Sequence, residues 1–226
     1  MKPVLAALAL LTIAAPAVAA DRPVVVELFQ SQGCSSCPPA NANLNAIAGR
    51  PDVLALSFGV TYWDQLGWKD TFATKAYTDR QRAYARALGA QLGTPEMVVE
   101  GRDSLVGMEP REVEAALHRA RPTSDTRIAS AAGRVEIAAG RAPRRAADVW
   151  LVRYDPRVQQ VSIRRGENGG KTLPHRDIVR QLTRLGGWNG AAVSFAPPAA
   201  PDPAYRTAVL VQEADGGPIL AAARLD

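Results

Sequence analysis

The chain has 226 residues, a formal net charge of +5 and two cysteines. Its basic residues gather tightly only at Arg141, Arg144 and Arg145, with no aromatic residues among them, which gives little support to a nucleic-acid-binding surface. We therefore expect no nucleic-acid partner. The length is enough for one large domain or two small ones.

Residues 1–20 have the pattern of a secretory signal peptide. Lys2 provides a positive start, residues 4–15 are apolar, and Ala17-Val18-Ala19 is a small-residue cleavage site. The apolar stretch is too short to span a bilayer, and no later segment looks like an integral membrane span. Cleavage after Ala19 or Ala20 predicts a soluble mature protein in an oxidising compartment, periplasmic or secreted, where cysteine pairs form lasting disulfides.

The chain up to about residue 120 predicts an alternation of strands and helices. Apolar, β-branched runs predict strands, amphipathic spacing predicts helices, and Gly, Pro or turn residues separate them. The expected strands are residues 24–29, 53–60, 97–100 and 104–106, and the expected helices are residues 41–48, 71–92 and 110–117. This βαβαββα order, with a mixed sheet, is that of an α/β thioredoxin-like domain, which we expect over residues 22–121.

That order predicts which segments meet. A right-handed crossover makes the first two strands parallel neighbours, so Cys34 and Cys37 after the first strand and the loop after the second lie at one sheet edge. The third strand runs the opposite way and brings Thr94-Pro95 to the same edge. Three segments that are distant in the sequence are thus expected to form one site.

From about residue 123 the pattern changes to short alternating strands separated by turn signals. We expect a smaller antiparallel β-rich domain, sandwich-like, over residues 123–226, with strands at residues 135–137, 148–154, 160–163, 208–212 and 219–223. A helix-like piece at residues 176–185 interrupts them. The run Arg165-Gly166-Glu167-Asn168-Gly169-Gly170 followed by His175 is open to two interpretations, a demanding hairpin turn or a functional loop.

Cys34-Ser35-Ser36-Cys37 holds both cysteines, three residues apart, so that they can close a disulfide with each other. At the start of a helix, unpaired N–H groups and the helix dipole favour a thiolate, which makes Cys34 the candidate nucleophile and Cys37 the resolving thiol. An inert local disulfide and a metal site are the alternatives. Zinc usually needs four ligands, and the two histidines, His118 and His175, are not spaced like a histidine pair, so we expect no metal and no cofactor.

Two further segments have candidate roles in the same site. Pro95 is expected to be a cis proline set against the cysteines, with Thr94 presenting its backbone to an extended substrate; an ordinary trans proline is the alternative. Glu27, a carboxylate inside the first apolar strand, is a candidate proton relay to Cys37, and its alternative is a carboxylate satisfied by other partners.

The aromatic segment after the second strand contains Tyr62, Trp63 and Trp68. Aromatic rings with a polar tip are suited to binding an exposed polypeptide, so these residues are candidate substrate contacts. A satellite core under a long loop is the other interpretation, and the sequence does not decide between them.

With these motifs in place, the chain resembles the bacterial secreted family known as domain of unknown function 1223, within the thioredoxin-like superfamily. The resemblance covers nearly the whole mature chain. It is carried by Glu27-Leu28-Phe29, Cys34-Ser35-Ser36-Cys37-Pro38-Pro39, Tyr62-Trp63-Asp64 with Gly67-Trp68, Thr94-Pro95-Glu96-Met97-Val98-Val99 and Arg165-Gly166-Glu167-Asn168. Where this chain has Asp177, the family pattern has Asn. The resemblance implies a fold and a redox site, and it implies no substrate.

The leading hypothesis is a periplasmic thiol-disulfide oxidoreductase that acts on a protein or small thiol or disulfide substrate with a separate redox partner. The rival is a non-catalytic secreted binding module in which the disulfide is structural. A copper-handling protein is a third option, and it would need ligands beyond the two sulfurs, such as Met97.

Overall fold

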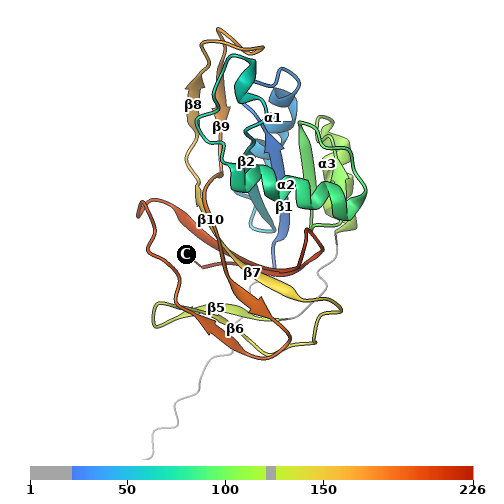
Figure 1. Cartoon of the computed structure of the whole chain (residues 1–226), viewed down its shortest axis with the longest axis vertical. Helices are drawn as coiled ribbons and strands as arrows, with labels where there is room; N and C mark the ends of the chain where they lie inside the picture. Colours follow the sequence, from blue (N-terminus) through green and yellow to red (C-terminus); the bar gives the residue numbers. More distant parts are fainter. Residues whose placement is uncertain (1–21, 121–125, 226) are drawn as a thin grey trace, which may run out of the picture.

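The computed structural model describes residues 22–120 and 126–225. In the first half the order of elements is βαβαββα, as predicted, with a short 3-10 helix added after the second strand (Figure 1). The strands are β1 (Val24–Gln30), β2 (Val53–Gly59), β3 (Glu96–Val99) and β4 (Asp103–Leu105); the helices are α1 (Cys37–Ile47), η1 (Asp64–Leu66), α2 (Lys75–Leu88) and α3 (Pro110–Arg119).

The pairing of these strands agrees with the prediction. β1 lies parallel to β2, antiparallel to β3, and β3 forms a hairpin with β4. The carboxyl ends of β1 and β2 therefore lie at the same edge as the start of β3. This edge holds the cysteine loop.

Within residues 126–225 there are nine further strands, and their pairing is largely antiparallel, as expected. They are β5 (Ile128–Ala131), β6 (Arg134–Ile137), β7 (Ala147–Asp155), β8 (Gln159–Ser162), β9 (Thr172–His175), β10 (Ile178–Trp188), β11 (Val193–Phe195), β12 (Arg206–Glu213) and β13 (Ile219–Arg224).

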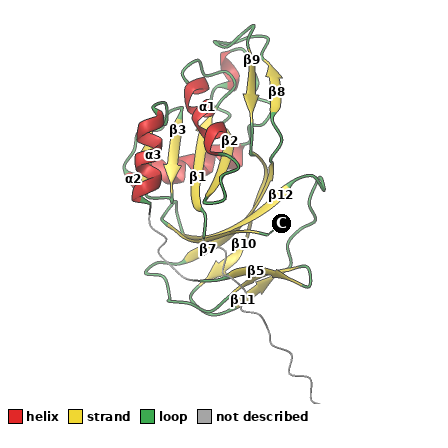
Figure 2. Cartoon of the chain, turned by 180° about the vertical axis from the view of Figure 1, so that it is seen from behind, coloured by secondary structure: helices red, strands yellow, loops and turns green. Residues whose placement is uncertain are grey.

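The main sheet runs across both halves of the chain. Its eight strands are ordered β13-β12-β7-β10-β2-β1-β3-β4, and the junction is the parallel bridge between Ile178 of β10 and Ser57 of β2. Seen from behind, β7, β10 and β12 extend below β1 and β2 (Figure 2). The strands of the second half thus share hydrogen bonds with those of the first.

A second, three-stranded sheet is made of β5, β6 and β11. It packs on the part of the main sheet that contains β7, β12 and β13. Val135 and Ile137 of β6 pack with Val149 and Leu151 of β7 and with Trp188 in one buried cluster. Sheet on sheet is the sandwich-like packing expected of the second half, but one of the two layers belongs to the main sheet.

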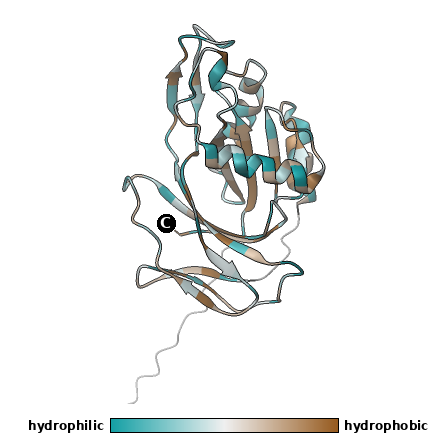
Figure 3. Cartoon of the chain, viewed as in Figure 1, coloured by the Kyte–Doolittle hydropathy of each residue, from teal (hydrophilic) through white to brown (hydrophobic). Residues whose placement is uncertain are grey.

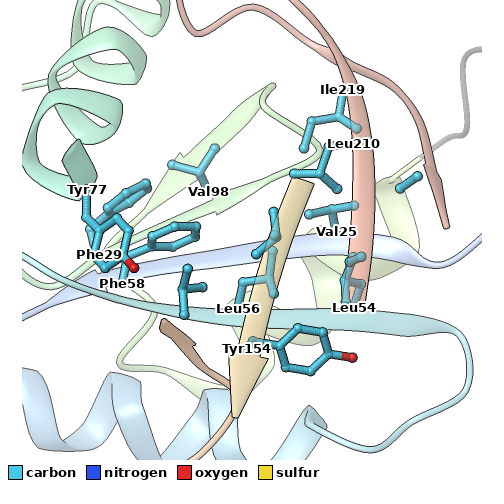
Figure 4. Close-up of a cluster of buried hydrophobic side chains, with 14 of the residues drawn as sticks. Val25, Phe29, Leu54, Leu56, Phe58, Tyr77, Val98, Tyr154, Leu210 and Ile219 are labelled. Atoms are coloured by element: carbon cyan, nitrogen blue, oxygen red, sulfur yellow. The ribbon is translucent and has the colours of Figure 1, made fainter. Parts of the chain in front are cut away.

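Around β1, both faces of the main sheet are buried. Successive side chains of β1 point alternately into two buried clusters. Val25 and Phe29 face α2, in a core that also includes Tyr154 and Leu210 from the second half (Figure 4). Val26 and Leu28 face α1 and α3. The strands behind α2 carry hydrophobic colours, whereas α2 itself is mixed, as suits a surface helix over a buried sheet (Figure 3).

The helix-like piece expected at residues 176–185 was wrong, because this segment forms most of β10. Its apolar residues recur every three or four positions, as in a helix. The register of β10 against β7 shifts between Val179 and Gln181 and again between Arg184 and Gly186, so the strand leaves the strict two-residue alternation. A strand with two such register shifts can thus carry apolar residues at the spacing of a helix.

All three α-helices differ from their predicted limits, α3 only in ending at Arg119 instead of residue 117. α1 begins at Cys37, four residues earlier than expected, because Pro38 and Pro39 fit the first turn, where their missing N–H groups cost nothing. α2 is shorter at both ends: the Thr74 side chain accepts a hydrogen bond from the N–H of Tyr77, and Gly89 ends the helix in the left-handed conformation.

The predicted signal peptide, residues 1–20, lies outside the described residues. Within residues 22–120 and 126–225, none of the helices has the length and apolar character needed to cross a membrane.

Candidate functional site

Cys34 and Cys37 lie between the end of β1 and the first turn of α1. Their sulfurs are at bonding distance, 2.25 Å, and their Cα atoms are 5.4 Å apart, as in a disulfide. A turn joins them, because the N–H of Cys37 donates to the carbonyl of Cys34. The pair therefore lies where the positive end of the helix dipole favours a thiolate once the bond is broken.

The predicted convergence of Thr94-Pro95 on the cysteines is confirmed. The Thr94–Pro95 peptide bond is cis. The Thr94 carbonyl oxygen lies 3.8 Å from the Sγ of Cys34 and accepts a hydrogen bond of 3.4 Å from the Ser36 hydroxyl. The backbone just ahead of β3 thus borders one side of the disulfide.

Both sulfur-bearing residues are buried: Cys34 has 0% and Cys37 has 1% of its surface exposed. Between them, Ser35 and Ser36 are exposed to solvent. A thiol from another molecule therefore reaches the disulfide only after a covering segment moves. Besides the Thr94 backbone, two segments are hydrogen-bonded to the residues around the disulfide.

The first of these segments is the loop after β2. The indole N–H of Trp68 donates to the side-chain oxygen of Gln32, and the backbone N–H of Gln32 donates to the Asp70 carboxylate at 2.7 Å. Burial raises the pKa of Asp70 to about 6, although hydrogen bonds from the N–H groups of Gln32 and Phe72 oppose this shift. This loop holds the residues that lead into Cys34.

The second of these segments is the turn between β8 and β9, a hairpin that stands beside α1 in both views (Figures 1 and 2). Asn168 donates to the carbonyls of Gln32 and Cys34, and Glu167 accepts from the N–H and hydroxyl of Ser35. The sequence predicted this turn, but not that it lies against the loop of Cys34. The one available signal was the Gly-rich run itself, which says that a turn forms and not what it contacts.

Tyr62, Trp63 and Trp68 lie on the loop after β2 and are partly buried. Tyr62 and Trp63 pack against the core on the α2 side, and the Tyr62 hydroxyl donates to Gln81 of α2. Trp68 is the aromatic residue bound directly to the segment before Cys34. Their role as substrate contacts stays a prediction, and their packing matches the satellite-core interpretation at least as well.

Glu27 is completely buried on the face of β1 that points toward α2. Arg80 donates two hydrogen bonds to its carboxylate, at 2.7 and 3.1 Å, and the Tyr84 hydroxyl donates a third. α1, which begins with Cys37, packs on the opposite face of the sheet. The carboxylate therefore has its own partners, which fits the second interpretation of Glu27.

His175, at the end of β9, is 1% exposed. The side-chain amide of Gln30 donates to its Nδ1 over 3.1 Å, whereas its Nε2 finds no hydrogen-bond partner among the described residues. Burial lowers the pKa of His175 to about 4, so the ring is neutral near pH 7. It is one of the groups that join the β8–β9 hairpin to the main sheet.

The described residues offer no group of three or more His, Cys, Asp or Glu side chains that could hold a metal ion. Met97, a candidate copper ligand, is buried in the cluster under α1. A hollow of about 480 Å³ lies away from the cysteines. It is lined by Arg102, Arg141, Ala142, Pro143, Arg144, Trp188, Glu213, Pro218 and Leu220.

Comparison with known proteins supports the resemblance drawn from the motifs. The family described as "Protein of unknown function (DUF1223)" matches residues 25–212. The chain is similar to the crystal structure of protein AGR_C_4864 from Agrobacterium tumefaciens, with 33% identity and a TM-score of 0.73 over 89% of this chain and 93% of that one.

The chain is also similar to HBP35 of Porphyromonas gingivalis, with a TM-score of 0.56 over 90% of this chain and 74% of that one. At 12% identity this second likeness shows the fold alone. No curated protein matches the chain.

Proposed function

The chain belongs to the DUF1223 family, and we propose that it is a thiol-disulfide oxidoreductase of the periplasm or exterior, acting through Cys34 and Cys37. The observation that carries this proposal is the disulfide at the first turn of α1, 3.8 Å from the carbonyl of Thr94 ahead of a cis proline. This is the arrangement expected of a thioredoxin-like redox site. The predicted signal peptide supports an oxidising compartment.

In the oxidising direction, a substrate thiolate attacks the Sγ of Cys34. The bond to Cys37 breaks, and Cys37 leaves as a thiolate that takes a proton from solvent. A second substrate thiolate then attacks the substrate sulfur of the mixed disulfide, and Cys34 leaves. The substrate dithiol loses two electrons and becomes a disulfide, while the protein disulfide becomes a dithiol. The reverse sequence reduces a substrate disulfide, and turnover in either direction needs a second thiol or disulfide partner.

The surrounding residues have proposed roles in this exchange. Thr94 offers a backbone edge at which an extended substrate can lie, since its carbonyl borders the disulfide. Trp68 and its neighbours Tyr62 and Trp63 form the substrate-facing loop, which must shift because it holds Gln32 ahead of Cys34. A protein or small thiol substrate thus reaches the disulfide when this loop moves away.

Glu27 contributes least to the proposal. Its carboxylate is bound by Arg80 and Tyr84 on the face opposite α1, which supports a structural role better than a proton relay to Cys37. The relay stays a prediction. It requires that Glu27→Gln change the pH dependence of the reduction rate of the disulfide and not only the stability of the fold.

Trapping tests the proposed exchange. Cys37→Ala leaves Cys34 without its resolving partner, so mixed disulfides with periplasmic proteins should accumulate and be released by dithiothreitol. Cys34→Ala is the matched control and should trap none. The proposal fails if Cys37→Ala traps nothing and the wild-type pair has a reduction potential below about −300 mV, as structural disulfides do.

The burial of both sulfurs favours a second candidate function, a non-catalytic binding module whose disulfide braces the cysteine loop. This alternative predicts that Cys34→Ser and Cys37→Ser lower the free energy of unfolding and leave the set of bound proteins unchanged in pull-downs. Loss of those bound proteins in both variants would instead point back to chemistry at the sulfurs.

A further inference from the structure

The turn between β8 and β9 is built to keep one shape. The N–H of Gly169 donates to the carbonyl of Gly166, the N–H of Gly170 donates to that of Ile163, and the N–H of Lys171 donates to that of Asn168. Gly166 and Gly170 have φ values of +75° and +82°, which side chains other than glycine rarely adopt. The turn therefore presents Glu167 and Asn168 in a defined geometry.

Asn168 is completely buried, and both polar atoms of its side chain are hydrogen-bonded. Its amide nitrogen donates to the carbonyl of Gln32 at 3.0 Å and to that of Cys34 at 2.8 Å, while its oxygen accepts from the Lys171 ammonium at 2.9 Å. The two carbonyls flank Gly33. One side chain thus ties the residue before Gly33 to the nucleophile that follows it.

Glu167 contacts the same loop one residue further on. One of its carboxylate oxygens accepts from the backbone N–H of Ser35 at 3.0 Å and from the Ser35 hydroxyl at 2.7 Å. These hydrogen bonds lower the pKa of Glu167, so it is charged near pH 7. A negative charge is therefore bound to Ser35, the residue between Cys34 and the N-cap of α1, and occupies the N–H of Ser35.

We propose that Glu167 and Asn168 are positioning residues for the thiol-disulfide exchange proposed above, on which this inference rests. Asn168 holds the loop of Cys34 closed, so that opening of the hairpin turn limits access to the disulfide. Glu167 disfavours the Cys34 thiolate, so that the disulfide resists reduction. Both effects come from a turn more than 130 residues away in the sequence, since Ser35 and Glu167 are separated by 132 positions.

The effect of Glu167 follows from charge. Reduction creates a thiolate at Cys34, and a neighbouring carboxylate raises the free energy of that reduced form without affecting the neutral disulfide. The N–H of Ser35 that already donates to Glu167 is also not free to stabilise the thiolate. Because Glu167 is exposed, solvent screens the repulsion, and we expect a moderate effect.

Equilibration with reduced and oxidised glutathione tests the charge effect. Glu167→Gln should favour the dithiol form by about three- to tenfold in the equilibrium constant, equivalent to about 15–30 mV in the reduction potential. Glu167→Asp keeps the charge and should stay near wild type. An equilibrium constant for Glu167→Gln equal to that of wild type, or shifted toward the disulfide, overturns the role of Glu167.

The rate of reduction by dithiothreitol tests the closure effect. Asn168→Ala removes both hydrogen bonds to the cysteine loop and should speed reduction at least tenfold. Gln160→Ala is the control, because Gln160 is an exposed residue of β8 in the same hairpin. If Asn168→Ala does not fold, Asn168→Ser, which keeps one small donor, should show an intermediate rate. Rates equal to those of wild type and Gln160→Ala overturn the role of Asn168.

These measurements use the protein's own disulfide and small reagents, so they do not depend on a natural substrate. If Cys37→Ala traps nothing while the Glu167 and Asn168 variants behave as expected, the exchange function fails and the turn still controls the disulfide. If trapping succeeds and the variants match wild type, the exchange function stands without these positioning residues.

Discussion

Asp177 combines two unfavourable conditions in one residue. Its backbone has φ +50°, in the left-handed region, and only 6% of its surface is exposed. Burial raises the pKa of its carboxyl to about 6, although Arg176 and other basic residues nearby oppose the shift. Asparagine tolerates the same backbone conformation and has no charge to bury.

We expect Asp177→Asn to stabilise the protein above pH 6. The folded-state pKa lies above the ordinary value of 3.8, so the stabilisation from protonated Asp177 is complete below about pH 4 and is lost as the pH rises through 6. The free energy of unfolding of Asp177→Asn should exceed that of wild type by about 1–2 kcal/mol at pH 8, with little difference at pH 4. Urea denaturation at both pH values measures this.

Asp215→Asn is the matched control for that variant. Asp215 also has a left-handed backbone, with φ +60°, but its side chain is 83% exposed. Its replacement should change stability little and equally at both pH values. A gain at Asp177 that does not depend on pH would assign the effect to the backbone rather than to the buried charge.

At the scale of elements, the contact between α2 and β1 depends on a buried ion pair. Arg80 is bound to Glu27 with side-chain exposures of 6% and 0%, and its guanidinium lies over the rings of Tyr84 and Trp150. A charged pair inside an apolar core is costly to separate, since either partner alone is left as an uncompensated charge. The pair therefore fixes how α2 sits on the sheet.

Arg80→Met should lower the free energy of unfolding by about 3–5 kcal/mol, because it leaves the Glu27 carboxylate buried without its cation. The double variant Glu27→Leu with Arg80→Met should recover most of that loss, since it removes both charges. Arg82→Met, at a half-exposed position of the same helix, is the control and should change stability by about 0.5 kcal/mol or less. Guanidinium denaturation measures all three, and a double variant no more stable than Arg80→Met would contradict this account.

At the scale of the whole molecule, the two halves share a sheet and a core. The bridge from Ile178 to Ser57 joins their strands, and Tyr154 and Leu210 of the second half pack with Leu54 and Phe29 of the first. At the other side, the N–H of Ile219 donates to the carbonyl of Glu100. The two domains predicted at residues 22–121 and 123–226 are therefore joined through buried surface rather than through a linker alone.

We expect the intact chain to unfold in one cooperative transition, and a chain ending at residue 120 to show none, because its α2-side core would lose its partners in β7, β12 and β13. Differential scanning calorimetry of both chains measures this. A cooperative transition in the shortened chain would favour two independent domains.

Much of the first half follows from local pattern. Apolar runs, proline and glycine positions and the spacing of the cysteines predicted βαβαββα, the parallel β1–β2 pair and the meeting of Cys34 with Thr94. These features could be predicted because strand alternation and helix capping depend on a few neighbouring residues, and the handedness of the crossover follows one rule of chirality. The same local reasoning mistook β10 for a helix, because its apolar residues are spaced as in a helix, while its register against β7 shifts twice.

The sequence by itself determined the Cys34–Cys37 pair, its place at the start of a helix and its cis-proline neighbour. Only the tertiary structure decided that the two cysteines are buried, that Glu27 forms an ion pair with Arg80, and that Asn168 donates a hydrogen bond to the carbonyl of Cys34. The reason is physical: 134 positions separate Asn168 from Cys34, and the hydrogen bond between them leaves no periodicity or spacing in the chain. Such contacts form where separately specified elements happen to pack, and packing is a property of the whole fold.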